Sequence, residues 1–192
     1  MMHLQIIVCC IVLLLLLYPR SRSHITSFAS TQRHRSPLPD LCHSLFPDFS
    51  HCYYMGDWMV IALCVAFIVY CIWTQDWKTF VYVLTVWIAG MVIKMIMTSV
   101  TVLPDPSGSC HVKAKSSFGF CHDLLPSGHM ILAFAIFVGV WPRLQSKWWK
   151  ALFVSTIVML WFFTISTKNH YTIDTLVSLF VVLGITHLIP RE

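Results

Sequence analysis

The chain contains few charged residues. Asp, Glu, Lys and Arg make up 11% of its 192 residues, whereas about a quarter is typical of soluble domains. Hydrophobic residues make up 57% of the sequence, the mean hydropathy is +0.73, and the apolar residues lie in long runs. The sequence therefore argues against an ordinary soluble domain and favours a lipid bilayer as the solvent.

The sequence also lacks a run of basic residues, and its formal net charge is only +5, so nothing in it points to nucleic-acid binding. None of the eight cysteines forms a CxxC pair, which argues against a structural zinc site. Half of the cysteines lie in polar segments, where disulfides would persist in an oxidising compartment. Spacing does not define the pairing of these four residues, which are Cys42, Cys52, Cys110 and Cys121.

Six apolar runs predict an all-α fold, a polytopic membrane bundle of about six transmembrane helices. The run at 4–18 is the least certain, because about 20 residues are typical of a span. No basic residue precedes it, so we favour a first span over a cleaved signal peptide. We expect 1–56 to form this span and the loop that follows it, and 57–192 to form a membrane-embedded core. The other spans are predicted at 58–74, 77–99, 128–141, 148–167 and 171–190.

Successive spans cross the membrane in alternate directions, so the spans at 128–141 and 171–190 begin on the same side. His129 stands at the start of the first and His170 at the start of the second. The span that contains Lys94 ends on this side as well. We therefore expect these groups to share one face with six of the eight acidic residues, Asp40, Asp48, Asp57, Asp105, Asp123 and Asp174.

His170 and Asp174 are four residues apart, so both side chains lie on one helical face. A carboxylate there can hold one imidazole nitrogen protonated and leave the other to attack an electrophile. The alternative is a polar pair that caps a span. Ionisable residues in membrane segments are costly and usually functional, so we favour catalysis.

His129 follows Pro126-Ser127-Gly128. Ser127 can cap the helix, and the first backbone N–H groups can bind a phosphate oxygen beside His129. No carboxylate lies four residues from His129, so His170 is predicted to be the nucleophile and His129 the proton shuttle. Alternatives are an ordinary helix cap, or zinc held by His122 and His129 without a third ligand nearby.

These motifs resemble the core of the type 2 phosphatidic acid phosphatase superfamily, and within it the sphingomyelin synthase branch. The branch has a Pro-Leu-Pro-Asp sequence before the second span, matched by residues 37–40. It has a basic residue nine positions before a Leu-Pro, matched by Lys94 before Leu103. Its Cys-Gly-Asp-x-x-x-Ser-Gly-His-Thr is matched in part by 121–130, and its His-Tyr-Thr-x-Asp in full by 170–174.

The chain departs from the branch at three positions. His122 stands in place of a glycine, Met130 in place of a threonine, and Lys94 in place of an arginine, which removes a bidentate fork for phosphate. The Lys-x6-Arg-Pro motif of the phosphatases is absent, and so is their Ser-Arg pair, where Phe163 and Thr164 stand. The resemblance thus favours a synthase over an ordinary lipid phosphatase.

The resemblance implies an enzyme that moves phosphocholine, phosphoethanolamine or phosphoinositol from a glycerophospholipid to ceramide through a phosphohistidine, with no metal or other cofactor. Lys94 would offset phosphate charge, or would anchor the helix at the interface by snorkelling. The alternatives are a lipid phosphate phosphatase with water as acceptor and a catalytically inactive lipid-binding relative. The implied catalytic residues are His129, His170 and Asp174, and the implied substrate-binding residues are Lys94, Ser127, Gly128, Asp123 and Tyr171.

The resemblance and the loop cysteines predict an active site on the lumenal or extracellular side of the Golgi, another endomembrane or the plasma membrane. The distribution of basic residues does not support this orientation, because cytoplasmic loops usually carry the excess of Lys and Arg. The site side carries Arg20, Arg22, Arg33, Arg35, Lys113 and Lys115, and the other side carries Lys78, Arg143, Lys147, Lys150 and Arg191.

The orientation can be tested with a cysteine placed at Ser107. We expect Ser107→Cys to be protected from the cytosol and labelled only by reagent that reaches the lumen or the cell exterior. Labelling after selective permeabilisation of the plasma membrane alone would place this loop in the cytosol and contradict the prediction.

Overall fold

The computed structural model describes residues 2–31, 36–106 and 125–191. Within these residues the fold is all-helical and contains no strand, which confirms the predicted fold class. Several residues singled out above lie outside the described ranges: Arg33, Arg35, Ser107, Cys110, Lys113, Lys115, Cys121, His122 and Asp123. The elements are α1 (Met2–Thr31), α2 (Leu41–Leu45), the 3₁₀ helix η1 (Ser50–Cys52), α3 (Met55–Thr74), α4 (Trp77–Val100), α6 (Gly128–Val140), the 3₁₀ helix η2 (Trp141–Arg143), α7 (Lys147–Ser166) and α8 (Thr172–Leu188).

All six predicted runs are helical, and three of the helices, α3, α4 and α7, are long and apolar enough to cross a membrane. The apolar parts of α1, α6 and α8 are shorter, at His3–Pro19, Gly128–Arg143 and Thr172–Leu188. Large apolar side chains cover the outside of the bundle: Trp73 is 87% exposed, Trp148 86% and Phe180 69%. An exterior of this kind suits lipid rather than water, so these features indicate an integral membrane protein.

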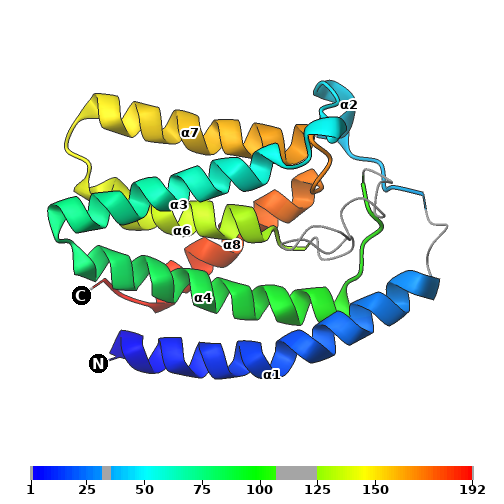
Figure 1. Cartoon of the computed structure of the whole chain (residues 1–192), viewed down its shortest axis with the longest axis horizontal. Helices are drawn as coiled ribbons and strands as arrows, with labels where there is room; N and C mark the ends of the chain where they lie inside the picture. The colour runs from blue at the N-terminus through cyan, green and yellow to red at the C-terminus, as the bar shows by residue number, and fades with distance from the viewer. Residues whose placement is uncertain (1, 32–35, 107–124, 192) are drawn as a thin grey trace.

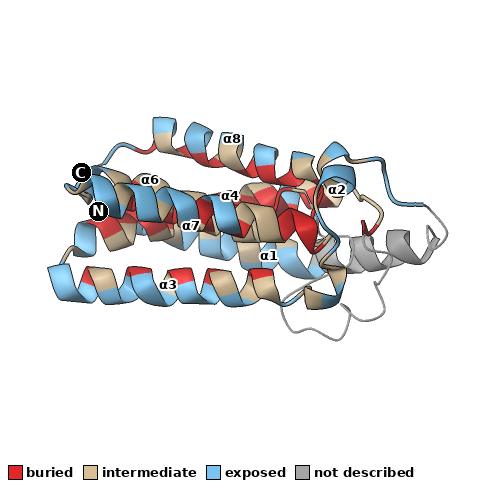
Figure 2. Ribbon diagram, turned by 90° about the horizontal axis from the view of Figure 1, so that it is seen from above, coloured by how far each residue is buried: buried red, intermediate tan, exposed pale blue. Residues whose placement is uncertain are grey.

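Helix α6 lies at the centre of the bundle and packs against α3, α4, α7 and α8. Four of its apolar side chains, those of Met130, Ile131, Ala133 and Ala135, are fully buried. Figure 2 shows that the buried faces of the surrounding helices turn inward and their exposed faces outward. Helix α1 runs along the outer side of α4 (Figure 1).

The starts of α6 and α8 and the end of α4 lie at one end of the bundle, together with α2 (Figure 1). The α3–α4 and α6–α7 connections and both chain termini lie at the other end. This arrangement confirms the side-to-side alternation expected from the spans. It places Lys94, His129 and His170 at the same end.

The segment from Arg20 to Tyr54 differs from the expected polar loop. Helix α1 continues to Thr31, because no glycine or proline stands between Arg20 and Thr31 and Pro19 does not end the helix. The two short elements α2 and η1 then form before α3. Cys42 and Cys52, which were candidates for disulfides, are free thiols in the structure.

Helix α6 approaches α4 closely at two glycines. A Cβ atom on Gly139 would lie 2.2 Å from Cγ2 of Val83, and one on Gly90 would lie 2.6 Å from Cγ2 of Ile131. Both distances are too short for carbon–carbon contact. The spacing between α4 and α6 therefore depends on the missing side chains at Gly90 and Gly139.

Gly139→Ala is expected to lower the free energy of unfolding by about 1–3 kcal/mol, because the added methyl overpacks the α4–α6 contact. Gly184→Ala is the matched control, since nothing lies within 4 Å of its Cβ position. Adding Val83→Ala to Gly139→Ala should restore part of the loss. Equal thermal stability of Gly139→Ala and Gly184→Ala in the same detergent would contradict this account.

Candidate active site

Helix α6 begins with the side-chain cap that the sequence predicts. The Ser127 hydroxyl accepts a hydrogen bond from the Met130 N–H at 3.4 Å, and the Ser127 carbonyl accepts one from the Ile131 N–H at 2.9 Å. The first N–H groups of a helix have no intrahelical partner. Those of Gly128 and His129 therefore open α6 as donors suited to an anion.

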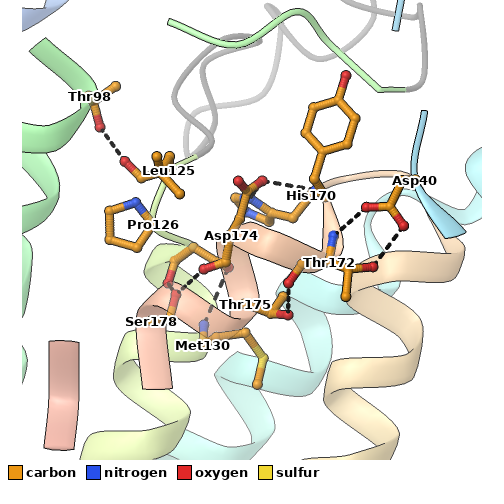
Figure 3. A network of polar contacts seen from close by, with 12 residues as sticks. Asp40, Thr98, Leu125, Pro126, Met130, His170, Thr172, Asp174, Thr175 and Ser178 are labelled. Atoms are coloured by element: carbon orange, nitrogen blue, oxygen red, sulfur yellow. Dashed lines mark hydrogen bonds and ion pairs between the residues drawn. The ribbon is translucent and has the colours of Figure 1, made fainter. Parts of the chain in front are cut away.

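Helix α8 begins with a buried carboxylate. One oxygen of Asp174, Oδ2, accepts a hydrogen bond from the Tyr171 N–H at 2.9 Å and lies 3.4 Å from Nδ1 of His170. Asp174 is fully buried and His170 nearly so. The predicted pairing of His170 with Asp174 is present (Figure 3).

Hydrogen bonds join the starts of α6 and α8 directly. The Ser127 N–H donates to the Asp174 carbonyl at 3.3 Å, and the Ser178 hydroxyl lies within hydrogen-bond distance of the carbonyls of Ser127 and Asp174, at 3.1 and 2.7 Å. This junction holds His129 and His170 with their ring centroids 6.1 Å apart, nearly edge to face. The structure thus brings the two histidines together, as predicted.

The expectation that His129 has no carboxylate partner is wrong. Its Nε2 lies 2.6 Å from Oδ1 of Asp57, which stands in the first turn of α3. The sequence argument considered only carboxylates near His129 along the chain, whereas Asp57 comes from another helix. The sequence predicts Asp57 on this face but gives no reason to bring it to His129. Because an ionised carboxylate only accepts hydrogen bonds, the contact requires a proton on Nε2 of His129.

Lys94 points into the bundle and not toward the interface. It is 4% exposed, and its ammonium donates a hydrogen bond of 2.8 Å to the Pro126 carbonyl. Its Cε lies 3.7 Å from the Cβ position of Gly128. The alternative of an interfacial anchor is therefore wrong, and the charge lies beside the start of α6. One turn further along α4, the Thr98 hydroxyl lies 3.1 Å from the Leu125 carbonyl and ties the same loop to α4 (Figure 3).

The segment before α3 is hydrogen-bonded, through Asp40 and His43, to the turn that carries His170. Asp40 accepts hydrogen bonds from the Thr172 N–H and hydroxyl, both at 2.7 Å (Figure 3). It also accepts hydrogen bonds from the N–H groups of Cys42 and His43 in α2. His43 Nε2 lies 3.0 Å from the His170 carbonyl. The Pro-Leu-Pro-Asp sequence thus fixes α8 and its histidine from outside. Sequence reasoning missed His43, although a cap by Asp40 was readable from an aspartate before a helical run.

Tyr171 also connects the start of α8 to neighbouring loops. Its hydroxyl donates to the Pro104 carbonyl and accepts from the Leu38 N–H, each at 3.0 Å. The ring is buried and packs against His43 at 5.6 Å between centroids. Three loops therefore meet at this side chain, and its predicted substrate contact stays a prediction. Asp123, also predicted to bind substrate, lies outside the described residues.

The pKa values of His170 and Asp40 are both lowered, for different reasons. Burial lowers the pKa of the His170 imidazole below its ordinary value, and the contact with Asp174 opposes this shift without cancelling it. Although partial burial acts in the opposite direction, hydrogen bonds from Thr172 and His43 lower the pKa of Asp40 below its ordinary value. Near neutral pH, His170 is therefore an uncharged imidazole and Asp40 a carboxylate.

Two helix starts with paired histidines beside a lysine can bind and transfer a phosphoryl group. Residues 120–189 match the family model described as PAP2 superfamily C-terminal. This match covers α6, α7, α8 and both histidines, and supports the type 2 phosphatidic acid phosphatase superfamily and a lipid phosphatase or phosphotransferase type of function. Comparisons with curated proteins and with solved structures gave no match. The PAP2 match does not include Lys94, Asp57 or Asp40.

Asp57→Asn tests the unexpected partner of His129. Loss of the charge that holds the proton on Nε2 is expected to lower kcat by roughly tenfold or more, by analogy with triad carboxylates. Asp48→Asn is the control, because Asp48 is an exposed carboxylate at the same end that pairs with Lys168. Head-group release from a labelled phospholipid measures both. An Asp57→Asn protein as active as Asp48→Asn would make the contact a bystander.

Proposed function

We propose that the chain is an integral-membrane lipid phosphotransferase that moves a phospho-head group from a glycerophospholipid to ceramide. The observation that carries this proposal is the pair of histidine rings 6.1 Å apart, each beside its own carboxylate. Two such imidazoles can address one phosphoryl group, one as nucleophile and the other as acid and base.

In the first half-reaction, His170 attacks the phosphorus atom. Asp174 holds Nδ1 of His170, so the attacking atom is Nε2, and burial favours the neutral form that attack requires. A phosphorus–nitrogen bond forms and the bond to the diacylglycerol oxygen breaks. That oxygen keeps the electron pair and takes a proton from His129, which enters the step as an imidazolium and leaves it as a neutral imidazole. Since Nε2 of His129 stays bonded to Asp57, the transferred proton comes from Nδ1.

In the second half-reaction, ceramide takes the head group. His129 removes the proton from the primary hydroxyl of ceramide, whose oxygen attacks the phosphorus. The phosphorus–nitrogen bond breaks and its electron pair returns to His170. Both histidines thus return to their starting protonation states, so no metal or redox group is needed to balance the cycle.

The charge on the phosphate is offset by groups at the start of α6. The backbone N–H groups of Gly128 and His129 and the positive end of the helix dipole favour an anion there. Lys94 adds a full charge beside them, held by the Pro126 carbonyl. Donors fixed before the reaction stabilise developing charge without reorganisation.

Ceramide is favoured as acceptor by the motifs shared with the sphingomyelin synthase branch and by the absence of the Lys-x6-Arg-Pro motif. An apolar exterior beside the site suits donor and acceptor lipids that arrive from the bilayer. We place the site on the lumenal or extracellular side, on the same resemblance. Water as acceptor would instead define a lipid phosphatase, and an inactive relative would form no covalent intermediate.

The proposal predicts that the label of a head-group-labelled phospholipid is trapped on His170. His170→Ala should carry no label. His129→Ala should become labelled more slowly, because the first half-reaction lacks its acid, but should retain the label that forms, because the second half-reaction lacks its base. His51→Ala is the control, since His51 is an exposed histidine at the same end. Peptide mapping that finds the label on His129, or a labelled His170→Ala protein, would reverse the two roles.

A further inference from the structure

A second polar pocket lies at the end of the bundle opposite the histidines. It encloses about 580 Å³ between α1, the start of α4, the end of α6 and the C-terminal segment. Its polar lining comes from His3, Lys78, Thr79, Arg143 and Arg191. None of these residues takes part in the reaction proposed above.

The pocket carries an excess of positive charge. Arg143 pairs with Asp76 at 3.1 Å and donates to the Thr79 hydroxyl at 3.2 Å. Arg191 stacks over the Tyr82 ring, 5.2 Å from its centroid. Lys78 is exposed and makes no ion pair in the described part of the chain. Among the described residues, three cations therefore face one carboxylate, and the positive end of the α4 dipole adds to them.

The walls of the pocket are amphipathic. Leu4, Val81 and Gly139 form apolar walls beside the cations, and Trp77, which is half exposed, also lines the pocket. Tryptophan at this position marks the boundary between hydrocarbon and head groups. A ligand that fits has an anionic end and an apolar continuation.

His3 supplies a separate indication of a missing partner. It is 9% exposed, its ring contacts Tyr82 edge to face at 6.2 Å, and its Nδ1 has no hydrogen-bond partner in the described residues. Buried polar atoms are usually satisfied by protein or by a bound molecule.

We propose that this pocket binds the head group of an anionic phospholipid from the leaflet opposite the catalytic site. Lys78 and Arg191 would contact the phosphate, Arg143 would stay with Asp76, and the acyl chains would leave along the apolar walls into the bilayer. Basic pockets between membrane helices commonly recognise such head groups. The apolar walls and the position at the membrane boundary favour a lipid over a free anion.

The test is lipid retention by the purified full chain, measured by native mass spectrometry after exposure to equal amounts of phosphatidylserine and phosphatidylcholine. The wild type should retain phosphatidylserine preferentially. Lys78→Gln/Arg191→Gln should lose this preference by about fivefold for each removed charge. Lys147→Gln, an exposed basic residue at the same end, should keep it. Both substituted side chains are exposed, and an unchanged melting temperature in phosphatidylcholine confirms the fold of the double variant.

Three outcomes would overturn the proposal. The first is equal retention of phosphatidylserine by the wild type and the double variant. The second is an equal loss in Lys147→Gln, which would show general surface attraction. The third is seen with millimolar inorganic phosphate added to the protein in phosphatidylcholine discs. If phosphate raises the melting temperature of the wild type as much as phosphatidylserine does, and does not raise that of the double variant, the ligand is a free anion.

Discussion

The junction between the starts of α6 and α8 is the constraint on which the site depends. The hydrogen bonds among Ser127, Asp174 and Ser178 leave these two helix starts little freedom to separate. Ser127, Asp174 and Ser178 are buried, and a buried polar group left without its hydrogen bond costs about 1–3 kcal/mol. His129 is two residues from one anchor and His170 four residues from another. The distance between their rings is therefore a property of the backbone as well as of the side chains.

The two histidines occupy different surroundings although both face carboxylates. His170 and Asp174 are buried, whereas His129 and Asp57 are both partly open. Burial keeps His170 neutral, which suits a nucleophile. The partly open pair keeps a carboxylate beside the His129 imidazole, which suits an acid and base. The assignment of roles thus rests on environment and no longer on the absence of a partner for His129.

The helical runs were predictable from the sequence because they are long, apolar and bounded by Gly128, Pro142 and the Gln75-Asp76 turn. The shared face of His129 and His170 followed from counting crossings. The contact of Asp57 with His129 did not, because it joins residues 72 positions apart, and spacing along one helix reports only local neighbours. The same limit hid the bonds of His43 to His170 and of Tyr171 to Leu38. The polar composition beyond Tyr18 predicts a loop, but α1 continues to Thr31 because no residue in this stretch ends the helix.

The central claim is that the paired histidines transfer a head group from one lipid to another. The most direct test is lipid mass spectrometry on membranes that express the chain and are supplied with isotope-labelled ceramide. The account predicts labelled ceramide bearing a phospho-head group in wild-type membranes and none in His170→Ala membranes. Labelled ceramide that stays unmodified in both, while phosphate is released from phospholipid only by the wild type, would contradict transfer and identify a phosphatase.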